Sequence, residues 1–127
     1  MTEIELPFAF LTWDNHFLIT IKYKDNIEVG IEEAKLLIEK ILCFVNKKRF
    51  SVLSDATDIT SSMDASARRY IAEHDEVNGL VDAHAIVVNG LSVRIIAQFY
   101  IKLNKRKHPR KIFSNLNEAK DWILQFG

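Results

Sequence analysis

One amphipathic helix pattern, set between two strand-like segments, constrains the fold of this chain most strongly. Apolar residues recur at helical spacing from Ile31 to Val45, which predicts a helix over residues 31–46. In the preceding segment, His16–Tyr23, aromatic or β-branched apolar side chains occupy every second position, as in a half-buried strand. The short apolar segment Phe50–Leu53 follows the helix. A strand, a helix and a strand in this order favour a right-handed crossover between parallel strands of one sheet.

The rest of the chain continues the alternation of strands and helices. Further strands are predicted at Leu6–Trp13, Ala83–Val88 and Arg110–Phe113, and further helices are predicted to begin at Ser61–Asp64, Leu91 and Asn115. Leu91–Leu103 also fits a strand, but its length favours a buried helix. Asp14-Asn15 predicts a two-residue hairpin turn between the first two strands. The sequence therefore predicts an α/β fold in one domain, residues 1–127: a mixed, mostly parallel sheet of about five strands with an N-terminal antiparallel hairpin and about four helices.

Composition excludes several classes of function. Lys plus Arg and Asp plus Glu both number 17, so the formal net charge is zero, which argues against specific binding to nucleic acid. Cys43 is the only cysteine, so no disulfide can form within the chain, and we expect a reducing, cytoplasmic setting. No stretch is long and apolar enough to predict a transmembrane segment, and the acidic N-terminus is unlike a signal peptide.

No catalytic or cofactor motif stands out in the sequence. The four His residues are widely spaced and there is no second cysteine, so we expect no metal site. The chain has neither a Gly-rich phosphate loop nor a nucleophile elbow, so we expect no cofactor and name no catalytic residue.

The segment from Phe50 to Tyr70 carries the candidate site. A short strand is followed by a turn rich in carboxylates and hydroxyls and then by a helix start, and open α/β folds place ligands at such strand ends. Its candidate partner-binding residues are Asp55, Thr57, Asp58, Ser62, Asp64 and Ser66, with Ser66 also a candidate phosphoacceptor. The alternative is local capping: aspartates that bind the amides of the turn, and Ser61 or Ser62 as the helix N-cap.

The same segment resembles the STAS domains, which include bacterial anti-anti-sigma factors of the SpoIIAA type and cytoplasmic domains of sulfate transporters. Asp55-Ala56-Thr57-Asp58-Ile59 and Met63-Asp64-Ala65-Ser66-Ala67 are similar to the two parts of the STAS motif. Ala65 stands at the position of the phosphorylated serine of regulatory members, and Ser66 has a hydroxyl one residue later. The element order resembles most a divergent bacterial subgroup of single-domain SpoIIAA-like proteins, related to the CRAL-TRIO fold.

The resemblance implies a non-enzymatic, regulatory interaction module that meets a protein partner or a second copy of itself. The alternative function is binding of a small apolar ligand or a lipid in a pocket between helices and sheet, for which the aromatic residues of the chain would supply the lining. An enzyme is the least favoured of the three classes.

Overall fold

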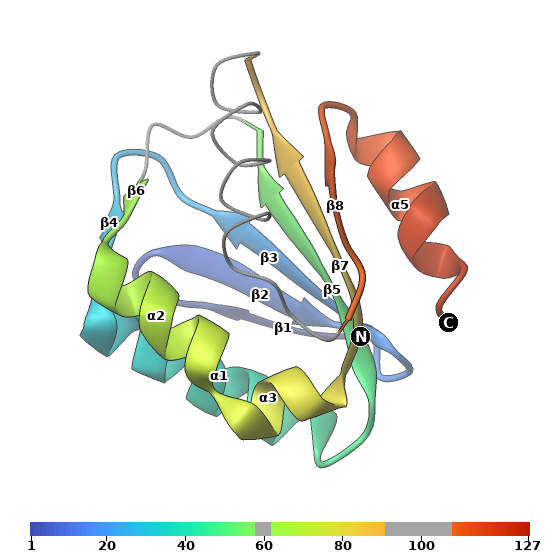
Figure 1. The fold of residues 1–127 in the computed structure, drawn as a ribbon, viewed down its shortest axis with the longest axis horizontal. Coiled ribbons are helices and arrows are strands. Elements are labelled where there is room, and N and C mark those ends of the chain that lie inside the picture. The colour runs from blue at the N-terminus through green and yellow to red at the C-terminus, as the bar shows by residue number, and fades with distance from the viewer. Residues whose placement is uncertain (58–61, 91–107) are drawn as a thin grey trace.

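A six-stranded mixed sheet forms the centre of the molecule (Figure 1). The computed structural model describes residues 1–57, 62–90 and 108–127. The strands are β1 (Thr2–Glu5), β2 (Ala9–Trp13), β3 (Leu18–Tyr23), β4 (Glu28–Val29), β5 (Phe50–Ala56), β6 (Ser62–Met63), β7 (Val81–Val88) and β8 (Arg110–Phe113). The helices are α1 (Ile31–Val45), α2 (Ala65–Glu73), α3 (Asp75–Leu80) and α5 (Leu116–Leu124). The predicted helix or strand at Leu91–Leu103 lies outside the described residues.

The strand order confirms the predicted fold class. The main sheet runs β1-β2-β3-β5-β7-β8, and β4 pairs with β6 in a separate two-stranded sheet. The pairs β1–β2 and β2–β3 are antiparallel, whereas β3–β5, β5–β7 and β7–β8 are parallel. The prediction of about five strands missed β1, a four-residue edge strand with the sequence TEIE.

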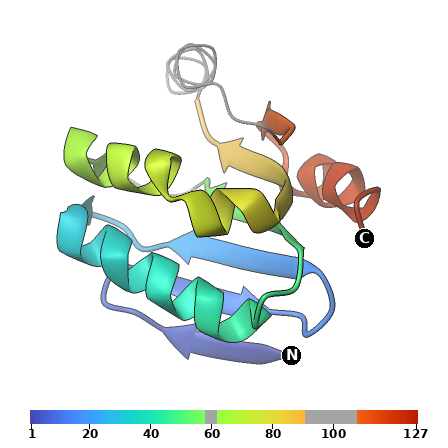
Figure 2. The ribbon, with the colours of Figure 1, turned by 60° about the horizontal axis from the view of Figure 1, so that its bottom comes forward.

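Two hydrophobic cores lie on opposite faces of this sheet. The larger core packs α1, α2 and α3 against strand residues such as Leu11 and Ile19. The smaller core packs Ala119 and Ile123 of α5 against Leu53 and its neighbours. Figure 2 shows α1 beside the α2–α3 pair on one side of the sheet and α5 on the other. α5 packs mainly on β5, β7 and β8, and it leaves the same face of β1, β2 and β3 largely uncovered by the described residues.

The observed helix ends correct two predictions. The second helix, whose start was predicted at Ser61–Asp64 and whose helical spacing continues to Val77, has Asp64 as its N-cap and ends at Glu73. His74 then caps α3, because its Nδ1 accepts a hydrogen bond of 3.3 Å from the Val77 amide. A side chain that competes for backbone amides in this way breaks a helix even where apolar spacing continues.

The turn between β2 and β3 is wider than the predicted two-residue hairpin. The Asp14 carboxylate accepts hydrogen bonds from the amides of His16, Phe17 and Leu18 at 2.8, 2.9 and 2.9 Å. Asn15 takes a positive φ of 64°, a conformation that Asn tolerates better than most residues. One side chain thus organises the four-residue turn, and the turn fixes the register between the two strands.

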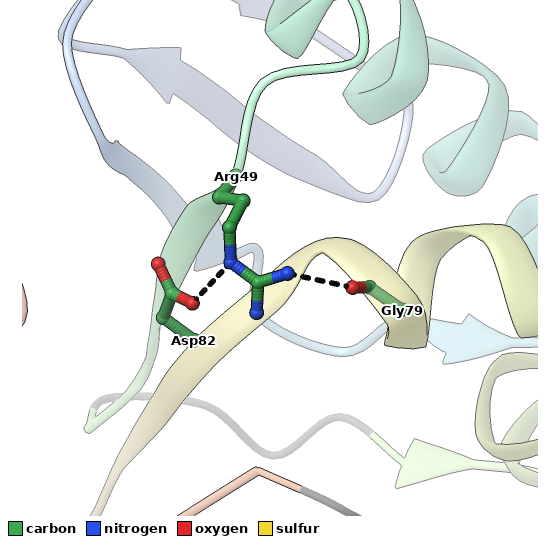
Figure 3. A network of polar contacts seen from close by, with 3 residues as sticks. All are labelled: Arg49, Gly79 and Asp82. Carbon is green, nitrogen blue, oxygen red and sulfur yellow. Dashed lines mark hydrogen bonds and ion pairs between the residues drawn. The ribbon is translucent and has the colours of Figure 1, made fainter.

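Arg49 ties the start of β5 to the end of α3 and to β7 (Figure 3). Its Nε donates to the Asp82 carboxylate at 2.7 Å, and its guanidinium donates to the Gly79 carbonyl at 3.2 Å. These contacts lie at the opposite end of β5 from Asp55 and the turn that follows it. They hold the frame of the sheet rather than the candidate site.

Candidate functional site

A groove of about 360 Å³ opens on the sheet face that carries α5. It lies where α5 stops covering the sheet, and strands and helix both contribute side chains to it. Its lining residues are Glu3, Phe10, Thr12, Thr20, Lys22, Leu53, Asp55, Leu116 and Lys120. Asp55 belongs to this set, so one of the residues predicted from sequence lies in the groove.

The strand register explains how the groove floor is assembled. Glu3, Thr12, Thr20 and Leu53 are successive neighbours across β1, β2, β3 and β5, so they form one row across the sheet. Side chains on one face of a sheet recur every second residue along a strand. The second row, two residues further along the strands, therefore shares the face of the first.

This second row contains the charged side chains of Lys22 and Asp55. Phe10 pairs with Lys22, and Lys22 pairs with Asp55, across β2, β3 and β5. The neighbouring Lys24 places its ammonium 5.0 Å from the centre of the Phe10 ring and forms a 2.6 Å ion pair with Glu5 at the sheet edge. The floor thus has hydroxyl groups in one row and charges beside an aromatic ring in the other.

The groove contains equal numbers of acidic and basic side chains. Lys22 and Lys120 supply two ammonium groups, and Glu3 and Asp55 supply two carboxylates. Within the part of the chain that the structure describes, none of these groups has an ion-pair partner within 4.0 Å. Lys120 reaches the groove from α5, whereas the other three come from β1, β3 and β5. Glu3, Lys22 and Lys120 are exposed, so a bound partner would find both signs of charge on the same face.

Asp55 is the last but one residue of β5, and it holds the turn that follows. Its Oδ1 accepts hydrogen bonds from the Thr57 amide at 3.1 Å and from the Thr57 hydroxyl at 2.6 Å. Only 8% of Asp55 is exposed. The local role that we weighed for Asp55, satisfaction of the turn amides, is present here, while the same carboxyl group also lines the groove.

Asp64 and Ser66 form a second cluster at the start of α2. The Asp64 carboxylate accepts hydrogen bonds from the Ala67 amide at 2.8 Å and from the Ser66 hydroxyl at 2.7 Å, and these bonds lower the pKa of Asp64 below its ordinary value. The backbone of Asp64 bonds Val29, and a Cβ added to Gly30 would lie 3.5 Å from an Asp64 oxygen. Asp64, rather than Ser61 or Ser62, is therefore the cap of this helix.

The predicted site residues fall into two groups. Asp55 and Thr57 lie at the end of β5 on the groove side, and Asp64 and Ser66 lie where α2 begins, in the helical layer that also contains α1. Ser62 lies in β6, where its amide donates to the Ile27 carbonyl at 3.0 Å. The remaining candidate, Asp58, lies outside the described residues.

Sequence reasoning overlooked most of the groove. Thr12, Thr20 and Lys22 are the polar members of alternating strands, so the period-two pattern marks them as residues that face away from the larger core. That pattern cannot tell whether such a face meets solvent or a helix. The position of α5, which covers only part of the face, decides it.

None of the helices in the described ranges combines the length and the apolar character that crossing a bilayer demands. No curated protein matches the chain. In a solved crystal structure from Shewanella loihica, a protein of the DUF3478 family with a SpoIIAA-like fold is similar with a TM-score of 0.62, over 91% of each chain, at 15% sequence identity. At that identity the likeness concerns the fold.

The fold comparison agrees with the strand order, and it confirms the SpoIIAA-like fold that the motif and the order of elements led us to expect. The chain therefore has a SpoIIAA-like fold. A family model, described as a domain of unknown function (DUF7793), matches residues 12–127, which include nearly all of the strands and helices described above. The chain therefore belongs to the DUF7793 family.

Proposed function

We propose that this chain is a non-enzymatic interaction module with a regulatory role, and that the groove beside α5 is its main binding surface. The observation that carries the proposal is the groove itself: an open trough of about 360 Å³ on a sheet face, with Asp55 in its lining. Exposed sheet faces with both apolar and charged side chains suit protein contacts, in which charged groups at the rim give orientation and specificity.

The chemistry of the groove supports binding rather than catalysis. Asp14, Tyr23 and Asp64, whose pKa values are shifted, all lie outside the groove. Burial alone raises the pKa of Tyr23 to about 12, which is a structural effect of the larger core. Active sites usually bring titratable groups with shifted pKa values together in one cleft.

Cys43 is the only cysteine, and we place this function in the cytoplasm.

Ser62, Asp64 and Ser66 would form a second contact region at the start of α2, whereas Thr57 would act with Asp55 at the end of β5. Ser66 is exposed, but its hydroxyl donates to the Asp64 carboxylate that caps α2. Phosphorylation of Ser66 would replace that bond with repulsion between two anionic groups. We infer that such a modification would loosen the start of α2, and would change this second region without touching the groove.

Photo-crosslinking from the groove floor tests the proposal. A benzophenone side chain would be introduced at Thr20, which lines the groove, and in a control variant at the exposed Glu39 of α1, on the other side of the sheet. In cells of the source organism, we expect a discrete covalent protein adduct from position 20 and none from position 39. Adducts of the same mass and yield from both positions, or no protein adduct from position 20, would refute the groove as the binding surface.

A second candidate function is binding of a small amphipathic ligand in the same groove. Its volume falls within the range of about 300–1,000 Å³ typical of ligand sites, and Phe10, Leu53 and Leu116 give it apolar walls. Native mass spectrometry of protein purified gently from its own cells would test this function. A bound mass that disappears in a Thr20→Trp variant, whose indole would fill the floor, would support a ligand carrier. A bare polypeptide mass would count against it.

A further inference from the structure

We infer that the groove receives a second copy of this chain, so that α5 of each copy lies over the β1–β3 region of the other. The inference rests on the proposed function and names the partner that the groove fits best. Its basis is the asymmetry of one sheet face, the balance of charges in the groove and one exposed apolar side chain on α5.

The first observation is that α5 covers only half of its sheet face. It packs on β5, β7 and β8 through Ala119 and Ile123, whereas Phe10, Thr12 and Thr20 on the adjoining strands stay partly exposed. A two-fold axis at the boundary between the halves would place a helix of the partner over each uncovered half. Such an isologous contact uses the same patch on both copies. The α5 helix of each copy packs into the groove of the other, so the same contact forms twice.

The second observation is that the groove complements itself in charge. Two ammonium groups, from Lys22 and Lys120, share it with the carboxylates of Glu3 and Asp55. No ion pair joins these four groups among the residues that the structure describes. In the two-fold contact that we infer, Lys22 and Lys120 of one copy would meet the carboxylates of the other, of which Glu3 is exposed and Asp55 lies deeper in the groove. A strongly acidic or strongly basic partner would meet like charges as well as opposite ones, so the balance favours a copy of the same surface.

The third observation is the position of Leu124. It is 59% exposed, an unusual state for a large apolar side chain in the described part of this chain. It lies one turn beyond Lys120 on α5, and residues four apart are neighbours on a helix surface. Leu124 therefore projects from the groove side of α5. There it can enter the partner's groove between Phe10 and the two threonines, Thr12 and Thr20.

Charge reversal on one side of the contact gives a test that needs no knowledge of the individual pairs. One variant carries Lys22→Glu and Lys120→Glu, which makes the groove acidic. A second carries Glu3→Lys and Asp55→Asn, which makes it basic. The control carries Lys35→Glu and Lys48→Glu, which gives the same charge change as the first variant. These two positions lie on α1 and just beyond its end, away from the groove. Circular dichroism and thermal melts would establish that all three variants fold.

Sedimentation velocity over about a hundredfold range of concentration gives the readout, since a dimer forms by mass action. We expect the parent chain and the control to dimerise, and each groove variant alone to bind itself at least about tenfold more weakly. An equimolar mixture of the two groove variants should recover the dimer, because the acidic groups of one variant meet the lysines of the other and only Asn at position 55 is uncharged. Leu124→Asn should weaken the parent dimer without any change in charge.

Two outcomes would overturn the inference. One is a parent chain that stays monomeric throughout the concentration range, and the other is a dimer that both groove variants retain unchanged. Neither outcome touches the proposed function itself, because crosslinking from position 20 would then still identify a different protein. If position 20 crosslinks to the chain's own mass, the two results agree.

Discussion

Removal of the Asp14 carboxylate should weaken the hairpin that forms half of the groove floor. In an Asp14→Ala variant the amides of His16, Phe17 and Leu18 lose an acceptor that lies 2.8 to 2.9 Å away. Loss of a comparable capping side chain costs about 0.5–2 kcal/mol, and hydrogen bonds to charged acceptors lie at the upper end of such values. Because the site is only partly buried, water would replace some of these bonds, and we expect a loss of about 1–2 kcal/mol in the free energy of unfolding.

An Asp14→Asn variant isolates the contribution of the charge, because its amide oxygen keeps an acceptor in place. Partial burial acts to raise the pKa of Asp14, but the hydrogen bonds from Leu18, His16 and Phe17 outweigh it and hold the pKa below its ordinary value of 3.8. A lowered folded-state pKa means that the stabilisation by charge is complete above the ordinary pKa. It is lost as the pH falls through the folded-state pKa.

Urea unfolding, followed by the fluorescence of Trp13 and Trp122, would measure both effects. With a slope of about 2 kcal/mol per molar urea, the midpoint of Asp14→Ala should fall by roughly 0.5–1 M at pH 7. The gap between the parent chain and Asp14→Asn should be present at pH 7 and close as the solution is acidified below the ordinary pKa. An unchanged midpoint for Asp14→Ala, or a parent-to-Asn gap that grows towards acid, would refute the reasoning.

Two further predictions concern the core on either side of the sheet. Ile38→Ala should lower the free energy of unfolding by about 2–5 kcal/mol, because the Ile38 side chain is 3% exposed in the larger core. The control Glu39→Ala, at an exposed position, should change it by no more than about 0.5 kcal/mol. Equal urea midpoints for the two variants would contradict the assignment of the buried face of α1. Ser51→Ala should leave stability unchanged or raise it by up to about 1 kcal/mol, since the buried Ser51 hydroxyl has no hydrogen-bond partner in the described structure. Ser54→Ala in the same strand should lower stability by about 1–2 kcal/mol, because the Ser54 hydroxyl lies 2.8 Å from Nε2 of His84. A melting temperature that is higher for Ser54→Ala than for Ser51→Ala would contradict the roles assigned to both hydroxyl groups.

The elements with strong local signals were predictable. The helix expected over residues 31–46 is observed at Ile31–Val45, and the side chain of Asn115 caps α5 as its motif predicted. The strand Arg110–Phe113 has the predicted bounds. In each case the decisive interactions join residues a few positions apart, so the sequence displays them directly.

The errors share a different cause. β1 has little apolar periodicity of its own, and it exists because Ile4 pairs with Leu11 across the sheet. α2 begins later than its serine motif suggested because Ser62 and Met63 pair with Glu28 and Val29. These pairings join residues distant in sequence, and their hydrogen bonds outweigh a local capping preference.

The candidate site was predictable only in part for a related reason. Asp55 stood out because it follows a buried strand, and the structure places it in the groove. Lys120 carried no signal, since one lysine on an exposed helix face is ordinary. Its place in the same groove as Lys22 depends on how α5 packs on the sheet, which is a property of tertiary packing.

The composition of the groove also bears on how the chain is synthesised. Its lining begins at Glu3 and ends at Lys120, so it draws on both ends of the chain. During translation the floor strands emerge first, but the helical wall follows only after β8 and the turn before α5. A nascent or C-terminally clipped chain would thus have most of the sheet and no complete groove. Binding at this surface would select folded molecules that include α5, and by mass action it would protect them from proteases that attack the unfolded state.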